Sequence, residues 1–216
     1  MNGPGGPDLD GAEAIRLFEL RSDPVRDLAG QADAVAEACH AMAVRFHRGG
    51  KLVVFGAGGA STDAQHVAVE FIHPVIVGKR ALPAVALTTD VATVTGIAGR
   101  AGMARVFDHQ LRFLAGPDDI ALGICTDGDS DGDSVRAGLL TAGELGLLTI
   151  ALVGSAVAGG AVAAPGGRIV ADHLLTAASA DPRVVKEVHV TMYHVLWELV
   201  HVFLEQPGVL EPGVAR

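Results

Sequence analysis

Short apolar runs alternate along the chain with longer stretches in which apolar residues recur every three or four positions. Short runs bounded by glycine, proline or acidic residues are typical of strands buried on both faces. They predict five strands, at Leu52–Phe55, Pro83–Leu87, Asp119–Ile124, Leu147–Val153 and, more weakly, at Arg168–Val170 or slightly beyond. The longer stretches predict helices at Ala12–Leu20, Pro24–His47, Ser61–His73, Asp90–Ala98, Ala104–Leu114, Ser130–Leu145 and Pro182–Glu205.

Two prolines mark expected helix starts. Pro24 suits a first helical turn, and Pro182 follows Asp181, whose side chain can cap the last helix. Strands alternating with helices predict a parallel sheet covered by helices on both faces. A length of 216 residues favours one domain over two small ones. We expect that domain over 12–206, a flexible Gly/Pro-rich tail over 1–11 and a second tail over 207–216.

Composition narrows the classes of function. The formal net charge of −9 disfavours nucleic acid as a partner, because phosphates repel an acidic surface. The two cysteines, Cys39 and Cys125, form no CxxC motif, and the N-terminal stretch has no apolar leader, which together indicate a cytoplasmic protein with reduced thiols. The uncharged stretch Leu145–Gly167 could span a bilayer by length. Its Pro165 and many small residues instead favour a buried strand followed by a loop, and no membrane span.

A glycine turn follows the first predicted strand. Ligands of parallel sheets bind at the carboxyl ends of the strands. The segment Gly56–Asp63 contains three glycines, so its backbone can approach a ligand closely, and the next helix offers free N–H groups to an anion. The glycine spacing is not that of a dinucleotide site, and the P-loop lysine is absent. A tight turn without a ligand explains the segment equally well.

An acidic loop follows the third predicted strand. Ser130 and Asp133 form a capping-box pattern for the next helix. Asp127, Asp129 and Asp131 imitate the start of a calcium loop, but Gly138 stands where the bidentate glutamate of an EF-hand is required. The alternative is a solvated acidic turn.

Two helices carry candidate catalytic side chains. His66 and Glu70 are four residues apart and share a helical face, so they can bind zinc or move a proton. A surface pair explains the spacing equally well. His194 lies in the most apolar part of the last helix, where it is either a ligand or a core histidine.

Together these segments resemble the phosphoheptose isomerase branch of the sugar isomerase (SIS) family. The order and spacing of the motifs agree with that family from Lys51 to His201. The matching motifs are Gly56-x-Gly-Gly, Asp63-Ala64-Gln65-His66-x3-Glu70, Ala84-x-Ala-Leu-Thr-Thr-Asp90, Gly116-Pro117-x-Asp119, Gly123-Ile124-x-Thr126-x-Gly128-x-Ser130 and Glu187-Val188-His189-x4-His194.

The resemblance implies a fold, an activity and a site. The implied fold is a flavodoxin-like three-layer α/β sandwich with a five-stranded parallel sheet, assembled as a homotetramer with shared sites. The implied reaction converts sedoheptulose 7-phosphate to a heptose 7-phosphate, often with zinc. His66, Glu70 and His194 match the zinc ligands, and Glu70 and His194 match the acid–base pair. The implied substrate-binding residues are Ala57, Gly58, Gly59, Glu70, Arg100, Cys125, Thr126, Asp127, Ser130 and Lys186.

The N-terminal helices of the family lie between subunits. We therefore expect a set of apolar residues on these helices to face a partner copy or, alternatively, to pack on the chain's own sheet. The residues are Leu17, Leu20, Leu28, Val35 and Phe46.

The chain departs from the family pattern at several site positions. Ala57 replaces an asparagine, Gly99-Arg100 replaces Asn-Asp, and Lys186 replaces the glutamine that completes the zinc site. Asp127 and Asp129 replace a hydroxyl and an amide in the phosphate loop, where like charge repels a phosphate. Arg100 and Lys186 can offset these acids, a divalent cation can bridge them to a phosphate, or the ligand can lack that charge.

Two functions follow from this pattern. The retained His66, Glu70 and His194 favour an aldose–ketose isomerase acting on a sugar phosphate. The altered loop and the lost glutamine favour a non-catalytic SIS module that senses a carbohydrate derivative or regulates a partner protein.

Overall fold

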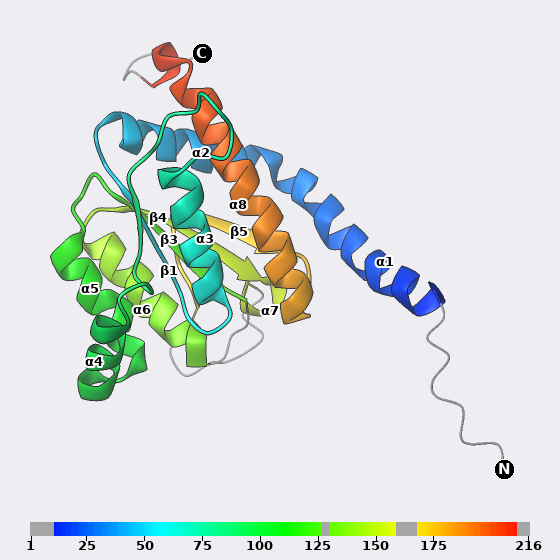
Figure 1. Cartoon of the computed structure of the whole chain (residues 1–216), viewed down its shortest axis with the longest axis horizontal. Coiled ribbons are helices and arrows are strands. Elements are labelled where there is room, and N and C mark those ends of the chain that lie inside the picture. Colours follow the sequence, from blue (N-terminus) through cyan, green and yellow to red (C-terminus); the bar gives the residue numbers. More distant parts are fainter. Residues whose placement is uncertain (1–10, 127–129, 159–167, 211–216) are drawn as a thin grey trace.

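The computed structural model describes residues 11–126, 130–158 and 168–210, and it contains a five-stranded, all-parallel sheet in the order β2-β1-β3-β4-β5 (Figure 1). The strands are β1 (Leu52–Gly56), β2 (Ala84–Ala86), β3 (Ile120–Cys125), β4 (Leu148–Gly154) and β5 (His173–Ala177). The helices are α1 (Gly11–Asp27), α2 (Ala32–His47), α3 (Ala60–Ile72), α4 (Val91–Ala101), α5 (Val106–Leu114), α6 (Ser130–Glu144), α7 (Ser155–Ala158) and α8 (Pro182–Leu204), with 3-10 turns η1 (Leu28–Gln31), η2 (Met103–Arg105) and η3 (Pro207–Val209).

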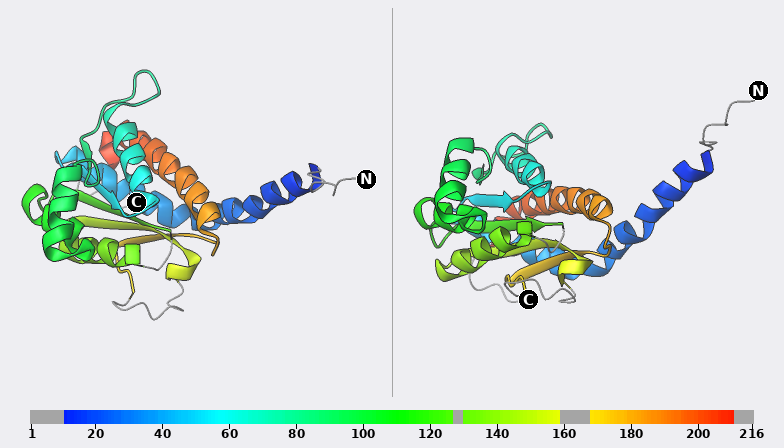
Figure 2. Two further views of the ribbon diagram at one scale, coloured as in Figure 1. Left: turned by 60° about the horizontal axis from the view of Figure 1, so that its bottom comes forward. Right: turned by 90° about the horizontal axis from the view of Figure 1, so that it is seen from below.

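The sheet lies between two layers of helices, as Figure 2 shows. Successive strand residues point to opposite faces, so Leu52 and Val54 belong to a core shared with α2, α3 and α8, whereas Val53 and Phe55 belong to a core shared with α5 and α6. The predicted α/β sandwich with a five-stranded parallel sheet is confirmed.

The fifth strand begins at His173, three residues after Val170, where the sequence predicts a weaker strand at Arg168–Val170 or slightly beyond. Asp172 explains this position: its carboxylate accepts hydrogen bonds from the backbone N–H and the hydroxyl of Thr149, at 2.9 and 2.8 Å. The pairing with β4 starts at the next residue, where His173 is in register with Ile150. Ile169 is buried but lies outside the pairing.

Pro24 lies inside α1 and does not start a helix, so this prediction was wrong. The regular helix continues to Asp27 and changes to a 3-10 turn at η1. Gln31 ends that turn and pairs with the edge strand β5, where its amide donates to the carbonyl of Thr176 at 2.7 Å and accepts from the N–H of Thr176 at 3.0 Å. The interruption between α1 and α2 therefore lies where the side chain of Gln31 bonds to the edge strand β5, and not at Pro24.

Glycines allow the strands to turn tightly at the carboxyl edge of the sheet. A Cβ on Gly56 would lie 2.9 Å from the carbonyl oxygen of Ile124, and a Cβ on Gly154 would lie 2.7 Å from that of Thr126. Gly58 has φ 54°, a conformation that favours glycine. The ends of β1, β3 and β4 are thereby held close together.

The first helix projects away from the sheet (Figures 1 and 2). Leu17 and Leu20 are 40% and 47% exposed, whereas Val35 and Phe46 are buried and Leu28 is half-buried against the core. The predicted set therefore falls into two groups: the residues of α2 are buried, whereas Leu17 and Leu20 of α1 are exposed.

No helix in the described part of the chain is long and apolar enough to cross a membrane. Within the uncharged stretch Leu145–Gly167, the described residues form the buried strand β4 and the short helix α7.

His189 of α8 is fully buried, and neither ring nitrogen makes a hydrogen bond of good geometry, although the backbone of Val153 lies beside the ring. Burial lowers the pKa of His189 to about 4, and the nearby charge of Lys186 acts in the same direction.

We expect His189 to make the fold sensitive to acid. The unfolded chain takes up a proton near pH 6.5 and the folded chain only near pH 4, so stability present above pH 6.5 is lost as the pH falls toward 4, by about 3 kcal/mol. Urea unfolding between pH 7 and pH 4 should therefore show a shallower loss for His189→Leu than for the unmodified chain. His109→Gln, which removes an exposed imidazole, is the control and should keep the full loss. Equal pH slopes for His189→Leu and the unmodified chain would contradict the prediction.

Candidate active site

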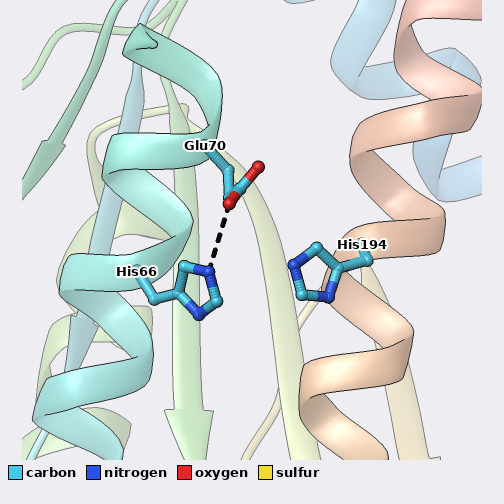
Figure 3. A group of neighbouring side chains, drawn as sticks. All are labelled: His66, Glu70 and His194. Carbon is cyan, nitrogen blue, oxygen red and sulfur yellow. Dashed lines mark hydrogen bonds and ion pairs between the residues drawn. The ribbon is translucent and has the colours of Figure 1, made fainter. Parts of the chain in front are cut away.

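Helices α3 and α8 bring His66, Glu70 and His194 together, and one ligand atom from each lies within 4.8 Å of the others (Figure 3). His66 and Glu70 lie on one face of α3 because they are four residues apart. His194 points toward them from α8. The two residues predicted to be the acid–base pair and the three predicted to bind zinc thus form one cluster, which we call the His66 cluster.

Hydrogen bonds order the His66 cluster. Nε2 of His66 lies 3.2 Å from Oε1 of Glu70, and the hydroxyl of Tyr193 lies 2.8 Å from Nδ1 of His66. The Glu70 side chain is only 11% exposed, whereas that of His66 is 42% exposed. A buried carboxylate is costly unless it is partnered, so this geometry favours a functional cluster over a solvated surface pair.

Lys186 joins α8 to the glycine turn. Its ammonium donates to the carbonyl oxygen of Gly59 (3.0 Å), to Oγ1 of Thr62 (3.0 Å) and to Oδ2 of Asp63 (2.6 Å). These contacts use its three donors, and a protonated amine cannot bind a metal. Lys186 therefore neutralises Asp63, which is 3% exposed, and adds no fourth ligand to the His66 cluster.

Sequence reasoning missed Asp63 and Tyr193. Asp63 is the acidic residue in the first turn of α3, a signal that also fits a simple helix-terminus charge. Tyr193 directly precedes His194, and burial, together with the nearby carboxylates of Asp63 and Glu70, raises its pKa. Only the packing of α8 against α3 shows that both side chains adjoin the site.

The glycine turn lies beside Lys186 at the carboxyl end of β1. Ala57 is buried, and its carbonyl accepts from the N–H of Ala60, while the carbonyl of Gly58 accepts from the N–H of Ser61. Gly59 is exposed and leaves open space at its α-carbon. The turn presents backbone to the same side of the molecule as Lys186.

The acidic loop is described only at its two ends. Cys125 is buried at the end of β3, and Thr126 is half-buried. Asp127 and Asp129 lie outside the described residues, as does the side chain of Ser130 at the start of α6. The predicted roles of these three residues therefore remain predictions, and Asp133 pairs with Arg136 at 2.6 Å.

Arg100 lies apart from the His66 cluster. It is exposed on α4 and lines a separate hollow of about 430 Å³ with Thr93, Ile97 and His109. Within the residues that the structure describes, this chain does not bring Arg100 to the His66 cluster.

The His66 cluster has the donor chemistry of a metal centre. Imidazole nitrogen and carboxylate oxygen both bind Zn²⁺, and catalytic zinc sites use three protein ligands and keep one position open. The residues present therefore fit a divalent cation, with His66, Glu70 and His194 as its ligands.

Comparisons with known proteins agree on one family. A family model for the SIS domain matches residues 23–154. The phosphoheptose isomerase of Solidesulfovibrio magneticus is 38% identical over 207 residues, which cover 93% of this chain and 95% of that protein. The phosphoheptose isomerase of Geobacter sulfurreducens is 39% identical over 175 residues, with coverages of 81% and 86%. The solved phosphoheptose isomerase of Francisella tularensis is 30% identical with a TM-score of 0.75, covering 89% of this chain and 98% of that one.

Lys186→Met should destabilise the fold, because it leaves the carboxylate of Asp63 buried without its cation. Since the Lys186 side chain is 38% exposed, the loss is expected to be about 1–3 kcal/mol, below the value for a fully buried pair. Urea unfolding measures it. Adding Asp63→Asn should recover part of the loss. The control Lys79→Met removes a pairing with Glu205, which is 60% exposed, and should cost less than about 1 kcal/mol. Equal losses for the two lysine variants would contradict the prediction.

Proposed function

Because this chain belongs to the SIS-domain family, and within it to the phosphoheptose isomerase branch, we propose that it interconverts sedoheptulose 7-phosphate and a heptose 7-phosphate. The chain is an aldose–ketose isomerase, an intramolecular oxidoreductase that acts on a sugar phosphate. The observation that carries the proposal is the His66 cluster, in which a buried carboxylate and a second helix's imidazole face each other.

The chemistry requires one proton to move between adjacent carbons through an enediol. In our proposal Glu70 removes the proton from the carbon next to the carbonyl, and His194 returns a proton to the neighbouring carbon. One oxygen of Glu70 contacts His66, and a carboxylate has a second oxygen that can meet the substrate.

Zinc is the cation that we propose for the His66 cluster, held by His66, Glu70 and His194. When bound, it would polarise the substrate carbonyl. Lys186 stays with Asp63, so the open coordination position is available to the substrate.

The phosphate and sugar are proposed to bind along the carboxyl edge of the sheet. The glycine turn (Ala57, Gly58, Gly59), Cys125 and Thr126 lie at this edge, and Asp127, Ser130 and Lys186 are retained as proposed contacts. Arg100 can contact the substrate only if it comes from another subunit, as the shared sites of the family imply.

We also propose that the protein is a cytoplasmic homotetramer. The first helix supports the tetramer, because α1 projects from the sheet and carries four apolar side chains that are between 40% and 74% exposed. These are Ile15, Leu17, Phe18 and Leu20. Covering these side chains with other copies would remove them from water. Arg21 donates to both carboxylate oxygens of Glu187, at 2.5 and 3.0 Å, and these bonds join the C-terminal half of α1 to α8.

Deuterium exchange tests the enzyme. Incubation with sedoheptulose 7-phosphate in D₂O should place deuterium on the carbon next to the carbonyl, and Glu70→Gln should slow this exchange at least ~100-fold because it removes the base. NMR follows the label, with and without added zinc. Glu144→Gln changes an exposed carboxylate paired with Arg112 and should exchange normally. If the unmodified chain exchanges nothing under either condition, the non-catalytic SIS module becomes the better explanation. Unchanged exchange in Glu70→Gln would exclude Glu70 as the base.

The assembly is tested by light scattering after size-exclusion chromatography. Phe18→Glu places a charge in the exposed apolar face of α1, and we expect the tetramer to dissociate into smaller species. Glu19→Gln, on the same helix, should leave the mass unchanged. A monomeric unmodified chain would contradict the proposal.

A further inference from the structure

The imidazole of His66 has a partner at each nitrogen. Nε2 faces Oε1 of Glu70 at 3.2 Å within α3, and Nδ1 faces the hydroxyl of Tyr193 at 2.8 Å across from α8. The ring of His194 lies nearly perpendicular to that of His66, with the centroids 5.2 Å apart. The orientation of His66 is therefore fixed by groups on two helices.

Tyr193 is well placed to hold this ring. It is 1% exposed and belongs to the core shared by α2, α3 and α8, so its side chain has little freedom. Its ring meets His66 edge to face, with centroids 5.4 Å apart at 79°. Successive residues of a helix point about 100° apart. Tyr193 thus lies on the core side of the cluster, while its neighbour His194 lies on the more open side.

The phenol suits either neutral form of the imidazole. A neutral imidazole has one N–H donor and one acceptor nitrogen, whereas a tyrosine hydroxyl can both donate and accept. With the proton on Nε2, the imidazole donates to Glu70 and accepts from Tyr193. With the proton on Nδ1, it donates to Tyr193, and the lone pair of Nε2 is free for a cation.

We propose that Tyr193 is a positioning residue: its hydroxyl fixes the ring plane of His66 and is the hydrogen-bond partner of Nδ1 in either tautomer. In the metal-free protein Nε2–H faces Glu70, and when a divalent cation occupies the His66 cluster Nδ1–H faces Tyr193. Tyr193 acts through His66 and needs no contact with the substrate. The inference rests on the proposed function only where it takes His66 as a cation ligand. The tautomer of His66 in the metal-free protein depends on the fold alone.

The variant Tyr193→Phe tests this, since it removes the hydroxyl and keeps the ring. In spectra of protein with ¹⁵N-labelled histidine, the unmodified chain should show His66 as one tautomer, Nε2–H without zinc and Nδ1–H with zinc. The variant should keep Nε2–H without zinc, because Glu70 still accepts from it, but its Nδ1 resonance should shift because that nitrogen loses its hydrogen bond. Its zinc affinity, measured by competition with a chelator, should fall ~10–100-fold. Its kcat should fall, while KM changes little.

Met192→Leu is the matched control, because it alters a neighbouring buried residue of α8 and should keep both readouts. Thermal unfolding checks that each variant is folded. A Tyr193→Phe protein with an unchanged Nδ1 resonance and unchanged zinc affinity would overturn the inference. If the unmodified chain binds no zinc, the metal-free spectra decide: a change in the variant supports the inference and no change refutes it. A chain without turnover but with the expected tautomers would refute the proposed function alone.

Discussion

The packing of α8 against α3 is the contact on which the site depends. Lys186 and Asp63 join the two helices at the glycine turn, and Tyr193 and His66 join them farther along. The cap at Asp181 fixes where α8 begins, because its side chain accepts from the N–H of Arg183 at 2.9 Å. Since every side chain of α8 is placed by that start and by helical geometry, a shift of α8 along α3 would separate His194 from Glu70.

Most of the fold was predictable because its signals are local. Apolar runs predicted the strands β1, β2, β3 and β4. Asp90 caps α4 by accepting from the N–H groups of Ala92 and Thr93. The element boundaries that local patterns did not place depend on contacts between residues that are distant in the sequence. β5 begins where Asp172 reaches Thr149, and the break before α2 lies where Gln31 reaches β5. Neither partner is visible in the sequence around these residues.

The site was predictable in part, and for a different reason. Helical spacing places His66 beside Glu70, but nothing local places His194 opposite them, and the family resemblance supplied that third member. Lys186 was predicted to contact the substrate, and that role stays a prediction. Its pairing with Asp63 does not follow from residue type alone. An ammonium is drawn to the nearest poorly solvated carboxylate, and the identity of that carboxylate, Asp63, depends on how α8 packs.

The pairing of Lys186 with Asp63 also sets the charge of the site. Two carboxylates, Asp63 and Glu70, lie close enough to Tyr193 to raise its pKa. Because the ammonium cancels the charge of Asp63, Glu70 is the acid that faces the imidazoles of His66 and His194 with its charge uncompensated within this group. A carboxylate between two imidazoles can accept a proton from carbon, and it can equally attract a divalent cation. The lysine that replaces a ligand of the family thus keeps the remaining three groups electrostatically suited to either role.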